Sequence, residues 1–204
     1  MSDDSRDKIL DTFLGLVAEH GYGEVSLADV GTAAGLGKAE LYRLYPDKLA
    51  LVAGFMARID GEVLTATPVA DDPEETVRDR LFDMLMRRFD ALKPHRAALA
   101  SIRRAGLRDP LMALVLGPGL MRSMAAMLEA AGAKGDGLLG AVRQNGLLAL
   151  YAAVSRVFEK DESDDLSKTM AALDSRLKTA EKWAQTIDKY TVSPRRRAES
   201  APAA

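Results

Sequence analysis

Residues 26–48 hold the side chains best suited to a specific chemistry, and that chemistry is contact with double-stranded DNA. The stretch predicts two short helices joined by a tight turn at Gly35, followed at once by the start of a third helix. A helix-turn-helix of this kind most often lays its second helix in the DNA major groove. The sequence therefore predicts a DNA-binding element, and no other stretch indicates a function as directly.

The helices that must position this element have clear boundary signals. Ser26 followed by Asp29 is a variant of the capping box and predicts the start of the first helix of the motif. Gly35 can take the left-handed backbone conformation that the turn requires. Pro46 ends the second helix, and Asp47 can cap the helix that follows.

Helical periodicity continues along the rest of the chain. No stretch shows convincing strand alternation, so the predicted fold class is all-α. Helices are expected at 6–20, 48–66, 120–131, 138–159 and 165–190, with a break at 117–119 that separates 120–131 from what precedes it. The predicted domains are a helix-turn-helix domain at 1–50, a helical ligand-binding and dimerisation domain at 51–190, and a disordered tail at 191–204.

The composition argues against an enzyme. The 204 residues include no cysteine and two histidines, His20 and His95, neither of which has a partner at metal-ligand spacing. No phosphate-binding loop, dinucleotide fingerprint or nucleophile motif is present, and no pair of carboxylates converges. We therefore expect no catalytic residues, no metal and no cofactor.

Several features favour a cytoplasmic location. Residues 1–5 lack the apolar run of a signal peptide, and the absence of cysteine fits a reducing compartment. The most apolar long window, 138–158, is interrupted by Arg143, Gln144, Asn145 and Arg156, which makes it too polar for a lone transmembrane helix. No stable membrane insertion is expected.

The last predicted helix carries an apolar stripe that must be covered. Its members alternate four and three residues apart: Leu166, Met170, Leu173, Leu177, Ala180, Ala184 and Ile187. A second copy of the chain could cover the stripe in a four-helix interface, or the stripe could simply close the core of the single chain. For a homodimer, the candidate interface residues are Leu147, Tyr151, Val154, Leu173, Leu177 and Ala184.

Methionines concentrate in the middle of the chain and suggest a binding pocket. Methionine adapts to irregular apolar shapes, which suits a small apolar or lipid-like effector, although plain core filling explains the cluster equally well. The candidate pocket residues are Met84, Met112, Met121, Met124, Met127 and Tyr151. Nearby arginines that could pair with a ligand carboxylate, or simply be solvated, are Arg103, Arg104, Arg108 and Arg122.

Over residues 6–55 the sequence resembles the TetR family of bacterial transcriptional regulators. The resemblance is carried by RDKILD (6–11), GY (21–22), SLADV (26–30), AAGL (33–36), LY and YP (41–42 and 45–46) and KLAL (48–51). It implies an all-helical homodimer whose N-terminal domain binds a DNA operator. It also implies a C-terminal domain that holds a small apolar ligand controlling DNA affinity, most often as a repressor.

The same resemblance implies roles for individual residues. By position, Lys38, Tyr42 and Lys48 would contact DNA phosphates, which suits an ammonium or a hydroxyl donor. Ala39, Glu40 and Arg43 would face base edges, where an arginine can read guanine. Residues 1–55 contain five Lys and Arg against nine Asp and Glu, so this domain carries a net charge of −4. That sign weakens non-specific affinity for phosphates.

A second, more diffuse resemblance covers residues 76–186. The stretches LFDML (81–85), LALYAA (148–153), DESDD (161–165) and LDSRL (173–177) are similar to the lipid-binding accessory proteins of ubiquinone biosynthesis. Those proteins share the TetR fold but use it without DNA. The alternative function is therefore binding of a lipid or quinone precursor, with a degenerate helix-turn-helix.

Overall fold

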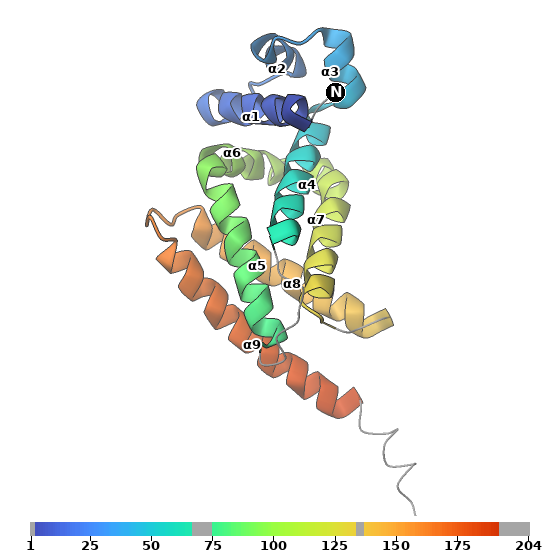
Figure 1. The fold of residues 1–204 in the computed structure, drawn as a ribbon, viewed down its shortest axis with the longest axis vertical. Coiled ribbons are helices and arrows are strands. Elements are labelled where there is room, and N and C mark those ends of the chain that lie inside the picture. The colour runs from blue at the N-terminus through green and yellow to red at the C-terminus, as the bar shows by residue number, and fades with distance from the viewer. Residues whose placement is uncertain (1–2, 67–74, 134–136, 192–204) are drawn as a thin grey trace, which may run out of the picture.

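The computed structural model describes residues 3–66, 75–133 and 137–191, and α-helices account for most of them (Figure 1). The described part contains no strand, which confirms the all-α prediction. The elements are α1 (Asp3–His20), α2 (Leu27–Ala34), α3 (Lys38–Leu44), α4 (Lys48–Ala66), α5 (Val77–Leu92), a 3-10 turn η1 (Lys93–His95), α6 (Arg96–Gly106), α7 (Pro110–Ala130), α8 (Gly137–Phe158) and α9 (Ser167–Thr191). The predicted tail lies outside the described residues except for Thr191.

Helices α1 to α3 form a small unit at one end of the molecule (Figure 1). The capping box at α2 is complete, because the Asp29 N–H donates to Ser26 Oγ at 3.2 Å and the Ser26 N–H donates to Asp29 Oδ2 at 2.8 Å. Gly35 ends α2 with φ of 71°, the left-handed conformation that glycine adopts without strain. The predicted helix boundaries of the motif are therefore confirmed.

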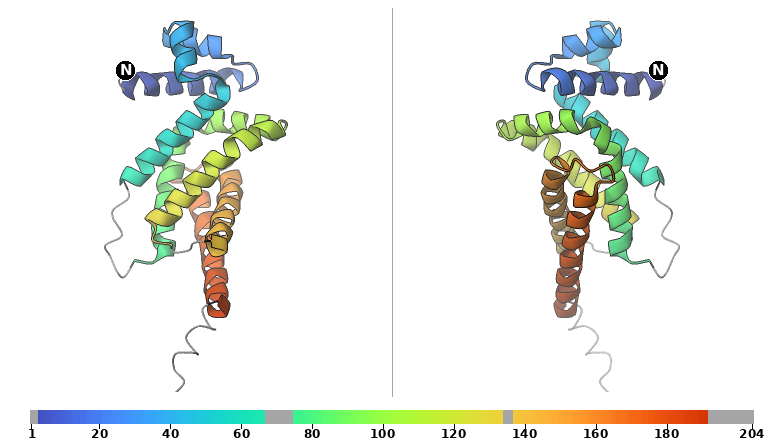
Figure 2. Two further views of the ribbon diagram at one scale, coloured as in Figure 1. Left: turned by 90° about the vertical axis from the view of Figure 1, so that its right-hand side faces the viewer. Right: turned by 90° about the vertical axis from the view of Figure 1, so that its left-hand side faces the viewer.

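Helix α4 connects this unit to the rest of the chain and continues into a bundle with α5, α7, α8 and α9 (Figure 1). Helices α8 and α9 pack along each other on one side of the bundle (Figure 2). Helix α1 also lies across α6, and the Tyr22 N–H donates to Ser101 Oγ at 2.9 Å. The helix-turn-helix unit thus contacts the bundle through α6 as well as through α4.

The predicted break at 117–119 is wrong, because α7 runs unbroken from Pro110 to Ala130 with Pro118 inside it. A proline in a helix loses one hydrogen bond, here the bond to the carbonyl of Leu114. Leu114 is 71% exposed and Pro118 is exposed as well, so the proline lies on the solvent side of α7, where the helix tolerates it. Among the described helices, α7 alone is long and apolar enough to cross a membrane, which by itself is weak evidence for a span.

Gly54 of α4 sets how closely the end of α3 approaches. A Cβ atom at this position would lie 2.9 Å from Cε1 of the buried Tyr45 ring. We expect Gly54→Ala to lower the free energy of unfolding by about 1–3 kcal/mol through overpacking, measured by urea denaturation. Gly61→Ala on the same helix meets no atom within 4 Å and should raise stability by about 0.5–1 kcal/mol. Equal effects at the two glycines would contradict the close contact.

Candidate nucleic-acid interface

Helix α3 presents two rows of side chains to solvent. At 3.6 residues per turn, Lys38 and Tyr42 form one row and Ala39 and Arg43 form the next, and all four side chains are exposed. Leu41 points the opposite way and is buried in the core of the unit. The recognition helix predicted from the sequence therefore has a single outward face, and this face carries two cations and a phenol.

A close helix contact holds α3 in this orientation. The backbone at Gly31 of α2 comes so near α3 that an added Cβ would lie 3.1 Å from Cδ2 of Leu41. A Cβ contact of this length is tighter than ordinary van der Waals contact, so a larger residue would push α3 outward. The lack of a side chain at Gly31 is therefore what allows this close approach to Leu41.

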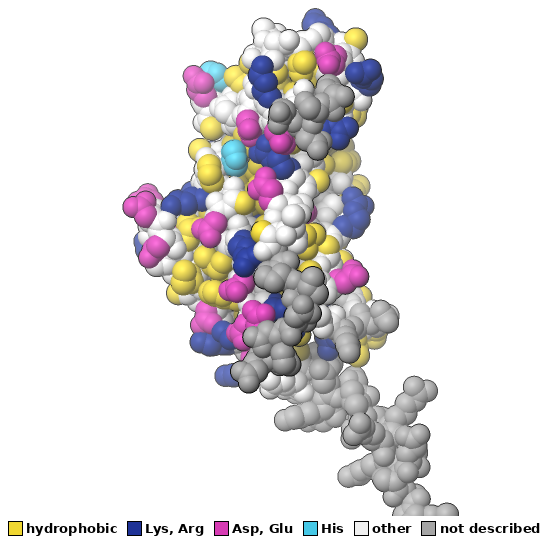
Figure 3. All heavy atoms as spheres, in the orientation of Figure 1, with side chains coloured by type: hydrophobic (Ala, Val, Ile, Leu, Met, Phe, Trp, Pro, Cys, Tyr) yellow, Lys and Arg dark blue, Asp and Glu magenta, His cyan; other side chains and the backbone are white. Residues whose placement is uncertain are grey.

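Glu40 lies beside the exposed face rather than on it. Its helical position is rotated away from the two outward rows, and its side chain is half-buried. In Figure 3 basic side chains lie at the α3 end of the unit, and a histidine with an acidic neighbour lies at the other end. The net charge of −4 is therefore unevenly distributed, and the face of α3 is locally basic.

Lys48, at the start of α4, is bound within the chain. Its Nζ donates to the Tyr22 carbonyl oxygen at 2.8 Å and lies 4.4 Å from the centroid of the Tyr22 ring. Partial burial lowers the pKa of Lys48, although nearby Asp29 and Glu24 oppose that shift. The residue borders an open groove of about 540 Å³ that Tyr42 and Pro46 also line. To bind a DNA phosphate in this groove, the Lys48 ammonium would have to share its N–H donors between the phosphate and the Tyr22 carbonyl.

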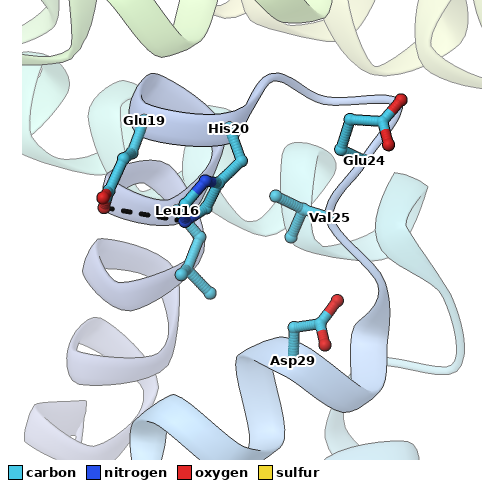
Figure 4. A pocket seen from close by; sticks show the side chains of 6 residues that line it. All are labelled: Leu16, Glu19, His20, Glu24, Val25 and Asp29. Atoms are coloured by element: carbon cyan, nitrogen blue, oxygen red, sulfur yellow. Dashed lines mark ion pairs between the residues drawn. The ribbon is translucent and has the colours of Figure 1, made fainter.

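A second groove, of about 710 Å³, lies between the end of α1 and the start of α2 (Figure 4). Three carboxylates line it, from Glu19, Glu24 and Asp29, and Nε2 of His20 pairs with Glu19 at 3.7 Å. Asp29 already caps α2, and within the described residues no group of three or more acids and histidines is arranged to hold a metal ion. This acidic groove is unsuited to DNA, and it shares Glu24 and Val25 with the groove that Tyr42 and Lys48 line.

Residues 9–54 match the family model described as bacterial regulatory proteins of the TetR family. The N-terminal domain belongs to the TetR family. A search of curated proteins finds no match to the chain. The TetR match covers α2, α3 and the exposed rows of α3, so the predicted helix-turn-helix DNA-binding domain is confirmed.

Solved structures extend this likeness over the whole fold. A TetR transcriptional regulator from Nitrosomonas europaea has a TM-score of 0.72 at 21% identity, covering 86% of this chain and 97% of that one. A putative TetR-family regulator from Syntrophomonas wolfei has a TM-score of 0.67 at 14% identity, covering 88% and 96%. A fatty acid degradation regulator from Bacillus halodurans has a TM-score of 0.60 at 19% identity, covering 87% and 96%. At these identities the likeness establishes a TetR-like fold.

The structure buries five of the six predicted pocket residues in the hydrophobic core. Met84, Met124, Met127 and Tyr151 are all buried there. Met112 is buried too, but it precedes Met124 by twelve residues of α7, or roughly 18 Å along the helix, and packs near Gly106. Met121 is half-buried, and its carbonyl accepts a hydrogen bond from Gln144.

Arg88 is the residue that the sequence analysis missed. It lies on α5 in the apolar row with Leu81, Leu85 and Leu92 and is completely buried, which the spacing of that row could have indicated. The four arginines considered as carboxylate partners are exposed instead, namely Arg103, Arg104, Arg108 and Arg122. Arg103 pairs with Glu159. Arg88, and none of these four arginines, therefore places a charged group inside the methionine-rich core.

Five of the predicted interface residues pack inside the single chain. They are Leu147, Tyr151, Val154, Leu173 and Leu177, all buried, while Ala184 is half-buried. Tyr151 stacks on Phe89 of α5 with the ring centroids 5.4 Å apart. The inward stripe thus closes the protomer core. Among the side chains that the structure describes on α8 and α9, the large apolar ones left exposed are Leu138, Val142, Met170 and Trp183.

Proposed function

We propose that this protein is a transcriptional regulator that binds a double-stranded DNA operator through α3. The observation that carries the proposal is the outward face of α3, where Lys38, Tyr42 and Arg43 are exposed together on a helix anchored by Leu41. Lysine and tyrosine suit phosphate oxygens, and arginine can read guanine in the major groove. A repressor whose operator affinity falls when an apolar ligand occupies the bundle fits the TetR-like fold.

The proposed regulator acts as a homodimer in the cytoplasm. Two recognition helices must be held about one helical turn of DNA apart, roughly 34–36 Å or a multiple, to read two half-sites. The exposed apolar residues of α8 and α9, including Val142 and Trp183, offer a surface for the second copy. Sedimentation equilibrium tests the dimer. The alternative of a lipid-binding protein without DNA binding is not favoured, because the helix-turn-helix matches the TetR family and α2 has its complete capping box.

The test of this function is DNA binding across a salt series. We expect purified protein to select a duplex from its own upstream DNA over random duplexes, measured by fluorescence anisotropy. Arg43→Ala should weaken binding to the selected duplex by about 5- to 150-fold, because it removes a contact worth about 1–3 kcal/mol. Lys38→Ala should weaken all duplexes alike and reduce the salt slope by about 1.

Arg122→Ala is the matched control, since it removes an exposed arginine on α7, outside the helix-turn-helix unit. It should leave both the selectivity and the salt slope unchanged. A folded protein that shows no selective binding at low salt would refute the proposed function. Equal losses for Arg122→Ala and Arg43→Ala would show that general charge, and not the α3 face, accounts for binding.

A further inference from the structure

The buried guanidinium of Arg88 has more donor hydrogens than good acceptors. A guanidinium carries five N–H donors, and this one is completely buried. Its Nε donates to Tyr151 Oη at 3.1 Å, and its Nη1 pairs with Asp60. The contact of its Nη2 is Met56 Sδ at 3.8 Å, and a thioether is a weak acceptor. The side of Arg88 that faces Met56 therefore lacks an oxygen acceptor.

The present counter-ion of Arg88 is able to leave. The side chain of Asp60 is 20% exposed, so its carboxylate can turn toward water once it gives up the hydrogen bond of 2.8 Å that it accepts from Ser123 Oγ. Arg88 has no such route to solvent. Because a buried guanidinium without a counter-charge is strongly unfavourable, whatever displaces Asp60 must itself be an anion.

Apolar side chains surround this polar cluster one helical turn away. Residues four apart share a helix face, which places Met56 beside Asp60 and Met84 beside Arg88. Two further pairs follow the same rule, namely Met127 with Ser123 and Leu147 with Tyr151. Methionine side chains rearrange readily, so this apolar layer can open around a chain-like ligand.

We propose that Arg88 binds the carboxylate of an acid with an apolar tail, and that this carboxylate displaces Asp60. The inference rests on the proposed function, since it names the class of effector that the bundle holds. A carboxylate is favoured over other anions because a single carboxylate occupies the position now, and because a guanidinium fork matches two carboxylate oxygens. The tail lies among the methionines, with Met56, whose Sδ is 3.8 Å from Nη2 of Arg88, next to the headgroup.

Displacing Asp60 acts on the helix that carries the DNA-binding unit. Asp60 lies on α4, and two residues earlier Arg58 pairs with Asp11 at 2.8 Å and with Asp7 at 3.4 Å, both on α1. The α4 segment between these contacts joins the ligand cluster to the unit that presents α3. Loss of the Arg88–Asp60 pair removes one of the contacts that hold α4 against α5 and lets this part of α4 shift, so the bound acid lowers operator affinity.

The test compares two ligands that differ only in the headgroup, dodecanoate and dodecanol, by isothermal titration calorimetry below their aggregation limits. For the wild-type protein we expect dodecanoate to bind at least about tenfold more tightly, because only it supplies a charge-assisted pair. Arg88→Met should abolish this preference while retaining weak binding of both ligands. Arg122→Met is the matched control and should keep the preference.

Asp60→Asn provides a test that retains the arginine. This substitution removes the negative charge that competes with the ligand for Arg88. The variant should therefore bind dodecanoate several-fold more tightly than wild type and show a larger ligand-induced rise in Tm. If circular dichroism shows that Arg88→Met is unfolded, Asp60→Asn still tests whether Arg88 binds the carboxylate. Dodecyl phosphate is the third probe and should bind less tightly than dodecanoate.

Equal affinities of wild type for dodecanoate and dodecanol would overturn the proposal, as would tighter binding of dodecyl phosphate or an equal loss in Arg122→Met. Operator binding is measured on the same samples by anisotropy. Acid binding at Arg88 without any DNA binding would reject the proposed function and keep the carboxylate site. Selective DNA binding that dodecanoate does not weaken would reject the regulatory step.

Discussion

Asp60→Leu is expected to lower the free energy of unfolding by about 3–5 kcal/mol, because it leaves the guanidinium of Arg88 buried without a counter-charge. The double variant Asp60→Leu/Arg88→Met should recover most of that loss. A buried ion pair replaced by apolar residues of similar volume is often neutral or stabilising, because neither charge then has to be desolvated. Urea denaturation followed by circular dichroism measures both variants.

Comparing the single variants with the double variant measures the coupling free energy between Asp60 and Arg88. Residues in direct contact show coupling, so the effects of Asp60→Leu and Arg88→Met should fall well short of additive. Additive losses would show that Asp60 and Arg88 do not interact in solution. Arg122→Met, at an exposed site on α7, should change stability by no more than about 0.5 kcal/mol.

Asp161→Ala is expected to cost about 3 kcal/mol of stability. The carboxylate of Asp161 is buried where the chain turns from α8 into α9. Its Oδ2 accepts from the N–H and the Oγ1 of Thr169, both at 2.7 Å, and its Oδ1 accepts from the N–H of Ser163 at 3.2 Å and from its hydroxyl. Removal of the carboxylate leaves the buried donors of Thr169 unpaired, at roughly 1–3 kcal/mol each.

The same site predicts a dependence on pH. Burial alone would raise the pKa of Asp161, but the hydrogen bonds from Ser163 and Thr169 outweigh it and hold the pKa well below its usual range. A depressed folded-state pKa contributes stability that is present above the unfolded value of about 4 and is lost as the pH falls below it. Stability should therefore drop below about pH 4 in the wild-type protein and drop less in Asp161→Ala. Asp164→Ala, at an exposed neighbour, should retain the wild-type profile.

Local signals predicted the helix-turn-helix well because each of its boundaries depends on a few neighbouring residues. The capping box of Ser26 and Asp29 and the left-handed Gly35 are local chemistry, and the structure contains both. The proline inside α7 lies instead where the helix faces solvent, as the exposure of Leu114 and Pro118 shows. That exposure is set by tertiary packing, which a glycine–proline–glycine pattern does not encode.

The contents of the bundle core were predicted less completely for a related reason. Periodicity identifies which residues face inward but does not say whether the same chain or a second copy covers them, so Leu173 and Leu177 were assigned to a dimer interface. Arg88 was overlooked because Arg87 beside it is exposed and the pair resembles a solvated surface. Its position in the row of Leu81, Leu85 and Leu92 was the available signal.

The backbone of Tyr22 has contacts that limit how the DNA-binding unit can move. Its N–H is held by Ser101 of α6, and its carbonyl is held by Lys48 at the start of α4. Ion pairs from Arg58 to Asp7 and Asp11 add further contacts between α4 and α1, and α1 also packs on α6. The unit is therefore fixed to the bundle by contacts spread over both α4 and α6. A shift of α4 relative to α6 would change the angle of α3 together with its position.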